Sequence, residues 1–242
     1  MEREEFLSEC LRLFGLNGLE CTENQAEKLY LLTERMLEVN KGMNLTAIKE
    51  EKAIILRHYV DSVTISEHIS EGARVIDVGC GAGFPALPLA IFRPDLRIVA
   101  LDGTAKRIRY VAETAEYLGL SGVTAVAARA EEYAFLDGYR ESFDYVTARA
   151  VAALPVLCEL CLPYVKVGGK MIAMKSQQAE DELAVSKRCI ELCGGEVGGL
   201  LPRHLTSDGV ETEQRNLIFI EKKQKTPRNY PRHFSKISKN PL

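Results

Sequence analysis

The segment best suited to binding a small molecule is the glycine-rich run from Asp77 to Pro85, Asp-Val-Gly-Cys-Gly-Ala-Gly-Phe-Pro. It follows an apolar run typical of a strand and precedes a segment typical of a helix. Glycine permits positive φ angles and lets a ligand approach the backbone, and the amide groups at the start of the next helix would face that ligand. A tight turn alone does not need three glycines in five residues, so the run predicts a binding site.

The spacing of the glycines indicates the kind of ligand. The dinucleotide fingerprint is G-x-G-x-x-G/A, but the sixth position counted from Gly79 is Phe84, and the spacing here is G-x-G-x-G. Asp102 ends the next predicted strand, 23 residues after Gly79, where a carboxylate can accept hydrogen bonds from both hydroxyls of a ribose. An adenosine-type cofactor without a pyrophosphate therefore fits better than NAD, and an NAD-dependent dehydrogenase stays an alternative.

Two further polar segments follow predicted strands. The segment 129–132, Arg-Ala-Glu-Glu, could present an acceptor or a backbone group to the amino group of an adenine, although a solvated helix start is an equal alternative for Glu132. Arg149 follows the fourth strand among apolar neighbours and is a candidate to hold a phosphate or the Hoogsteen edge of a guanine. Ligands of open α/β sheets bind at the carboxyl ends of strands, so we expect all these residues around one crevice.

The elements that position these residues alternate between strands and helices. The first 70 residues read as helices, because apolar residues recur at three- and four-residue spacing. Short β-branched or apolar runs then occur at 73–78, 97–101, 123–128, 143–148, 170–175, 197–201 and 216–221. Between the early runs lie helical segments, one of which Thr104 is expected to cap. This alternation predicts an α/β fold with a largely parallel sheet covered on both faces, and the last two runs predict an antiparallel hairpin at its edge.

Charge is distributed unevenly along the chain. Residues 221–242 carry seven Lys or Arg and one Glu, a net charge of +6, so the net charge of −3 leaves −9 for the rest. The tail contains Pro227, Pro231 and Pro241 and has little apolar content, so we expect it to be extended or loosely packed. Its basic residues, with Tyr230, His233 and Phe234 among them, could grip phosphates and stack on bases. An ordinary solubilising terminus is the alternative.

Composition narrows the class of protein further. The 242 residues are 46% hydrophobic and 27% charged, as in ordinary globular domains. No apolar run reaches the roughly 18 residues of a membrane span, and the acidic start has no signal-peptide core behind it. The odd count of seven cysteines indicates reduced thiols and a cytoplasmic protein. Cys158 and Cys161 could bind zinc, but buried thiols fit their apolar surroundings better, and we expect no metal.

Together these residues resemble the glucose-inhibited division protein B family, the bacterial small-subunit (16S) ribosomal RNA guanine-N7 methyltransferases. The matching segments are 44–48, 57–62, 77–91, 102–107, 129–132, 148–150 and 231–241. They occur in order at the expected spacing, from about residue 40 to the end. The chain departs from the family's pattern at Ala86, where glycine is usual, and at Gly103-Thr104, where serine-leucine is common, which puts only local contacts in doubt.

The resemblance implies a Rossmann-like class I methyltransferase fold with a mostly parallel seven-stranded sheet and one antiparallel strand. It implies a helical region over 1–70, a methyltransferase domain over 71–222 and a basic tail over 223–242. It also implies S-adenosylmethionine as methyl donor, S-adenosylhomocysteine as product, and 16S ribosomal RNA or the small subunit as partner of a monomer that binds no membrane. The cofactor residues it implies are Gly79, Phe84, Asp102, Gly103, Thr104, Ala130, Glu131 and Arg149. The catalytic or RNA-facing residues are Arg149, Arg129 and Lys175.

The chemistry implied by the resemblance needs little from the protein beyond alignment. Guanine nitrogen 7 carries an exposed lone pair and no proton, so no general base is required, and positioning can lower the barrier substantially. Asp77 could stabilise a cationic donor or cap the glycine turn, and both interpretations stay open. The alternatives are a small-molecule methyltransferase of the same fold and a non-catalytic factor that senses S-adenosylmethionine or binds RNA.

Overall fold

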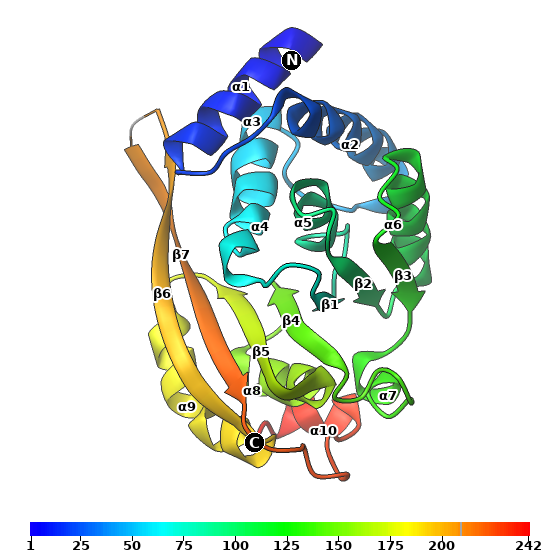
Figure 1. Cartoon of the computed structure of the whole chain (residues 1–242), viewed down its shortest axis with the longest axis vertical. Coiled ribbons are helices and arrows are strands. Elements are labelled where there is room, and N and C mark those ends of the chain that lie inside the picture. The colour runs from blue at the N-terminus through cyan, green and yellow to red at the C-terminus, as the bar shows by residue number, and fades with distance from the viewer. Residues whose placement is uncertain (209) are drawn as a thin grey trace.

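The computed structural model describes residues 1–208 and 210–242 (Figure 1). Its centre is a seven-stranded sheet of order β3-β2-β1-β4-β5-β7-β6. The strands are β1 (Arg74–Val78), β2 (Arg97–Asp102), β3 (Val123–Ala127), β4 (Phe143–Arg149), β5 (Val165–Lys175), β6 (Gly195–Ser207) and β7 (Val210–Lys222). β7 runs antiparallel to both β5 and β6, and the other neighbouring pairs are parallel. The predicted mostly parallel sheet with one antiparallel strand is therefore confirmed.

Helices cover both faces of the sheet (Figure 1). One face is covered by α1 (Arg3–Leu16), α2 (Glu23–Met43), α3 (Glu51–Ile54), the π-helical turn η1 (Ile55–Val60), α4 (Asp61–Val63), α5 (Ala86–Phe92) and α6 (Ala105–Tyr117). The other is covered by α7 (Ala130–Tyr133), α8 (Leu154–Cys161), the 3-10 turn η3 (Leu162–Tyr164), α9 (Ala179–Leu192) and α10 (Phe234–Lys239). A short 3-10 turn, η2 (Ser66–His68), leads to β1. Val75 packs into the first core and Ile76 into the second, as alternation along a strand requires.

The helices of the N-terminal region share their core with α5 and α6, which belong to the sheet domain. The division predicted at residues 70 and 222 stays a prediction. No helix among the described residues is long and apolar enough to cross a membrane. Cys158 and Cys161 are buried free thiols, and the described part of the chain contains no group of three acidic, His or Cys side chains placed to hold a metal.

The order of the strands places a crevice at one edge of the sheet. β1 pairs with β2 on one side and with β4 on the other, so the chain reverses its direction of winding next to β1. Ligands of open α/β sheets bind outside the carboxyl ends of strands at this switch point. The glycine turn that starts at Gly79 follows β1, and Arg149 is the last residue of β4.

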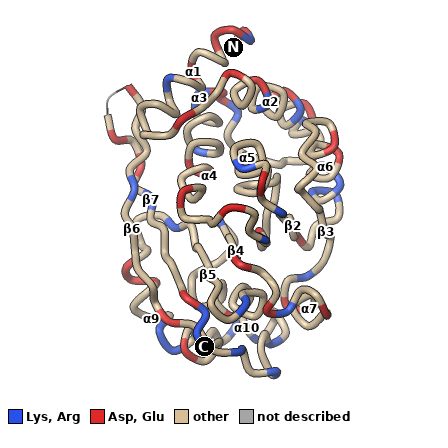
Figure 2. Tube along the Cα trace, in the orientation of Figure 1, with Lys and Arg blue, Asp and Glu red and all other residues tan. Residues whose placement is uncertain are grey.

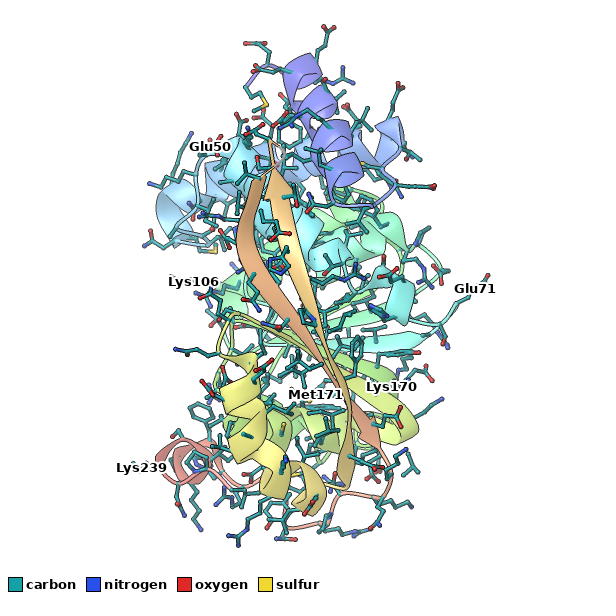
Figure 3. The ribbon with its side chains drawn as sticks, turned by 90° about the vertical axis from the view of Figure 1, so that its left-hand side faces the viewer. Glu50, Glu71, Lys106, Lys170, Met171 and Lys239 are labelled. Atoms are coloured by element: carbon teal, nitrogen blue, oxygen red, sulfur yellow. The ribbon has the colours of Figure 1, made fainter. Side chains whose placement is uncertain are left out.

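The β6–β7 hairpin is about twice as long as the predicted strands. Its far half extends past the sheet toward α1 (Figures 1 and 3), where Asn17 donates to the carbonyl oxygen of Thr206 over 2.9 Å. Polar residues such as Glu213 and Arg215 interrupt the apolar pattern of this half, which explains why the sequence predicted only the apolar part. The extension matters because it carries Glu213 and Arg215 toward η1 and α4.

Residues 223–233 form no helix or strand and are mostly exposed, as expected of the tail, but the expectation missed α10 and the residues that attach the tail to the body. Its Lys and Arg positions gather at the end of the molecule away from α1 (Figure 2). Lys222 is buried and donates to the carbonyl oxygen of Leu162 and to the hydroxyl of Thr226. Ile237 of α10 is fully buried. Composition predicted a loose tail because buried polar contacts leave no apolar pattern in a sequence.

One ion pair attaches the tail through a buried carboxylate. Glu159 on α8 is fully buried, and its carboxylate accepts from the backbone N–H of Arg232 over 2.8 Å, from its Nε over 2.9 Å and from its Nη2 over 2.7 Å. Replacement Arg232→Met should lower the free energy of unfolding by about 3 kcal/mol, because it leaves a buried carboxylate unpaired. Urea denaturation measures the loss.

Arg3→Met is the control, because Arg3 pairs with Glu27 on the surface and such a pair contributes about 0.5 kcal/mol. Equal losses for the two variants would show that the tail's ion pair does not anchor it.

Candidate active site

A pocket opens at the carboxyl ends of β1, β2 and β3, and we call it the first pocket. It is lined by Val78, Gly79, Leu101, Asp102, Gly103, Thr104, Ala128, Arg129, Ala130, Glu131, Val151, Ala152, Leu160 and Phe234. The structure thus brings together six of the residues predicted for the cofactor, which are Gly79, Asp102, Gly103, Thr104, Ala130 and Glu131. Arg129, predicted on the RNA side, lines this pocket as well.

Asp102 connects two turns of the first pocket. One carboxylate oxygen accepts from the N–H of Gly81 over 3.0 Å, and the other accepts from the N–H of Thr104 over 2.8 Å. Thr104 occupies the N-cap position of α6, but its side chain makes no capping bond, contrary to expectation. Each oxygen of Asp102 retains a further lone pair, so the carboxylate can still accept from ribose hydroxyls.

The glycine turn adopts a conformation that other residues rarely adopt. Gly79 has φ +74°, and a Cβ there would lie 2.6 Å from Cγ2 of Val151. Gly83 has φ +91°, and a Cβ there would lie 2.5 Å from Cδ1 of Leu87. Both glycines are therefore required by backbone geometry and by close packing, and Gly79 leaves room for the segment that follows β4.

Asp77 lies beneath the glycine turn rather than in solvent. Its carboxylate is 1% exposed and accepts from the N–H of Ala86 and from the hydroxyl of Thr147, each over 3.2 Å. Burial raises the pKa of Asp77 to about 7. Of the two interpretations left open by the sequence, this geometry favours the cap of the turn and of α5.

A second pocket lies beside the first. It is lined by Ile48, Arg57, His58, Asp61, Arg149, Ala150, Met174, Lys175, Ser176, Glu213 and Arg215. Arg149 and Ala150 line the second pocket, whereas Val151 and Ala152 line the first. The segment after β4 therefore forms the boundary between the two pockets. Ala150 has φ +56°, a strained conformation for a residue with a Cβ and one that occurs at functional sites.

Arg149 makes a dense set of contacts at this boundary. Its Nη1 donates to the carboxylate of Asp61 over 2.9 Å and to the carbonyl oxygen of Arg57 over 2.8 Å. Its guanidinium lies 5.4 Å from the centroid of the Phe84 ring, which stacks on His58 at 4.6 Å. Phe84 is only 6% exposed. The structure therefore places Arg149 and Phe84 next to the second pocket, and their assignment to the cofactor stays a prediction.

His58 is half-buried next to Arg149. Burial, and then the charge of Arg149, lower the pKa of His58 to about 3, so the ring is neutral at physiological pH. Nδ1 of His58 lies 3.3 Å from Nη2 of Arg149, and Nε2 lies 2.9 Å from the hydroxyl of Thr46. These partners assign an accepting Nδ1 and a protonated Nε2. A neutral ring supports Arg149 without repelling it.

Lys175, predicted as catalytic, is engaged within the protein. Its ammonium donates to the carbonyl oxygen of Ala152 over 2.9 Å and pairs with Glu182 at 2.7 Å, and its side chain is 11% exposed. Glu182 also accepts from the N–H of Leu154. Lys175 therefore fixes the segment after β4, which suits a positioning residue better than a group that contacts substrate.

The sequence missed several residues of the second pocket. His58, Asp61, Arg57 and Arg215 line this pocket, and the sequence alone assigned no chemistry to any of them. The resemblance already included the segment 57–62, so the signal was present but was not interpreted. Phe234 in the first pocket was expected to face RNA.

Comparison with known proteins agrees with this geometry. The family described as rRNA small subunit methyltransferase G (GidB) matches residues 25–205. A relative from Acetivibrio thermocellus named ribosomal RNA small subunit methyltransferase G is 41% identical over 245 residues and covers 100% of both chains. A relative of the same name from Oceanobacillus iheyensis is 42% identical over 227 residues and covers 93% of this chain and 94% of that one.

Solved structures with low identity share the fold. An S-adenosylmethionine-dependent methyltransferase from Aquifex aeolicus has a TM-score of 0.53 and 17% identity, covering 69% of this chain and 92% of that one. The [4+2]-cyclase SpnF has a TM-score of 0.54 and 16% identity, covering 68% and 82%. Because this fold hosts different reactions, these likenesses confirm the fold class alone. The match over residues 25–205 and the full-length relatives show more: the chain belongs to the rRNA small subunit methyltransferase G family.

Proposed function

We propose that this chain transfers a methyl group from S-adenosylmethionine to nitrogen 7 of a guanine in small-subunit ribosomal RNA. Family membership establishes an S-adenosylmethionine-dependent methyltransferase and ribosomal RNA as the substrate class. The observation that carries the finer proposal is the pair of pockets separated only by the segment after β4. Donor and acceptor can thus meet across one boundary. A monomeric state and a cytoplasmic location stay predictions.

The polar groups of the first pocket fit the donor. The carboxylate of Asp102 would accept from the ribose hydroxyls, and the backbone at Ala130 and Glu131 would meet the adenine. S-adenosylmethionine supplies a methyl group on a positively charged sulfur, which makes the transfer intrinsically favourable. The N–H groups of the glycine turn and of Thr104 are held in place by Asp102 and Asp77 before the ligand arrives, so little ordering is needed on binding.

The second pocket fits a guanine attached to RNA. Its lining includes four basic residues, Arg57, Arg149, Lys175 and Arg215, and two acidic residues, Asp61 and Glu213, a net charge of +2. Positive charge attracts RNA phosphates, and an Arg side chain can donate to the O6 acceptor of guanine. The neutral His58 is not needed as a base, because nitrogen 7 has no proton to remove. The chain's contribution is alignment and the exclusion of water.

Labelled S-adenosylmethionine and small subunits from cells that lack this gene test the proposal. We expect incorporation of one methyl group per subunit, and mass spectrometry of the digested RNA should identify 7-methylguanosine. Methylation at another atom would contradict the guanine-N7 assignment but not the family. Tight donor binding without methyl transfer would favour the non-catalytic alternative, and transfer to small molecules alone would favour the small-molecule enzyme.

A further inference from the structure

One residue of the first pocket comes from the far end of the sequence. Phe234 begins α10 in the tail and lines the pocket together with residues of the first three parallel strands. Figure 3 shows how the tail reaches this edge of the sheet: Lys239 of α10 lies on the same side of the molecule as Lys106, which follows β2, whereas Glu71, which precedes β1, lies on the opposite side. The tail therefore brings Phe234 to the carboxyl ends of the first three parallel strands.

Phe234 is part of a continuous wall at the end of β3. The guanidinium of Arg129 lies 4.8 Å from the centroid of the Phe234 ring, within the range of a cation–π contact. Nε of Arg129 donates to the carboxylate of Glu131 over 3.2 Å. A Cβ at Gly103 would lie 3.3 Å from Cδ of Arg129, so the stem of Arg129 rests on the turn after β2. Arg129 thus extends from that turn to the tail.

The position of the ring is fixed from within the protein. Arg232, two residues earlier, is attached to the buried Glu159 by three hydrogen bonds. Ile237, three residues later, is fully buried in the core under α8 and α9. A side chain that contacted only flexible RNA would not need to be fixed by buried contacts both before and after it in the chain.

We propose that Phe234 forms one side of the adenine subsite, so that the C-terminal tail is part of the methyl-donor site and not only an RNA contact. The proposal rests on the proposed function for the place of the donor. Any nucleobase has an apolar face, and aromatic side chains stack on such faces in proteins. Phe234 lies beside the backbone of Ala130 and Glu131, where the adenine is expected, so the flat ring gives the subsite its preference for an aromatic base.

Calorimetry with S-adenosylhomocysteine tests the proposal without RNA. Phe234→Ala should raise the Kd about tenfold or more, in the range found for loss of one base stack, whereas Phe234→Tyr should bind nearly as the parent does. Phe135→Ala is the matched control, because the Phe135 ring also lies under an arginine, with Arg140 at 5.3 Å, but it is 48% exposed and does not line the pocket. An unchanged Kd for Phe234→Ala would overturn the proposal.

The absence of tryptophan from the chain allows a second measurement. Phe234→Trp introduces the only tryptophan, which can be excited selectively over the nine tyrosines, and its emission should change on addition of S-adenosylhomocysteine or adenosine but not of homocysteine. A response to RNA alone would overturn the proposal and make Phe234 an RNA contact. If the parent binds S-adenosylhomocysteine and Phe234→Ala binds it equally well, this inference fails while the proposed function stands. If the parent binds but methylates no RNA, the proposed function fails instead.

Discussion

Replacing Arg149 with alanine is expected to lower kcat for rRNA methylation by two to three orders of magnitude, about the effect of losing one preorganised electrostatic donor in an active site. Arg149 lines the second pocket next to its boundary with the first, and its guanidinium holds η1 and α4 through Arg57 and Asp61. The alanine variant loses both the hydrogen-bond donor that faces the second pocket and the contacts that set the distance between the two pockets.

The variant should also be less stable. The side chain of Asp61 is 5% exposed, and its other basic partner, Arg215, lies farther away at 3.4 Å. Removing Arg149 leaves this carboxylate poorly compensated, which costs about 3 kcal/mol for a buried pair. Arg149→Lys retains the charge but not the planar guanidinium, whose Nη1 donates to Arg57 and Asp61 while its Nη2 faces His58, so we expect it to recover stability better than turnover.

Two measurements separate these effects. Arg149 lines the second pocket, so its replacement should leave the Kd for S-adenosylhomocysteine within about threefold of the parent value, a difference below 1 kcal/mol. The matched control is Arg93→Ala, because Arg93 likewise donates to backbone carbonyls and to a carboxylate, those of Ser66, Ile69 and Asp95. Its folded fraction should methylate RNA normally. A large rise in Kd for Arg149→Ala would show that Arg149 belongs to the cofactor site, as the family resemblance implies.

The first pocket was predictable because its signals are local in the sequence. The glycine turn follows its own strand, and Asp102 and Ala130 follow theirs, so the rule that ligands meet carboxyl strand ends brought them together without a three-dimensional model. The two positions that require a positive φ angle, Gly79 and Gly83, are visible in the sequence because they are glycines. The sequence did not indicate that Asp102 also holds two turns in place by accepting hydrogen bonds from their backbone N–H groups.

The second pocket was harder to predict because it is assembled from five segments that are distant in the sequence. They are Ile48, the turn from Arg57 to Asp61, Arg149 with Ala150, Met174 to Ser176, and Glu213 with Arg215, which the long β6–β7 hairpin brings to the others. A polar residue in a sequence does not indicate which distant residue it contacts in the fold. The tail shows the same difficulty, since Lys222 appears in the sequence as one more surface charge, yet it is buried and its pKa is lowered to about 8 by burial.

Replacing Asp102 with alanine is expected to weaken S-adenosylhomocysteine binding by at least about a hundredfold. Hydrogen bonds to a charged group contribute about 1.5–3 kcal/mol each, and the ribose offers two hydroxyls. The variant also frees the N–H groups of Gly81 and Thr104, so the turns must be ordered at the expense of binding energy. Calorimetry measures the affinity.

Asp144→Ala is the control, because Asp144 also lies on a strand of the sheet and accepts from a backbone N–H, that of Arg74, but near the opposite end of β4. We expect its affinity for S-adenosylhomocysteine to equal that of the parent. An unchanged affinity for Asp102→Ala would remove the ribose contact from the site.

A thermodynamic cycle combines Asp102→Ala with an analogue of S-adenosylhomocysteine that lacks both ribose hydroxyls. It separates the loss of the ribose hydrogen bonds from the loss of order in the two turns. The analogue cannot donate to the carboxylate, so any affinity that Asp102→Ala still loses with it comes from the two turns. We expect the larger part of the loss to disappear with the analogue, because the N–H groups of the turns can bind water when Asp102 is absent, whereas the hydroxyls of the natural ligand face an apolar methyl group. An equal loss with both ligands would mean that Asp102 acts on the donor only by shaping the glycine turn.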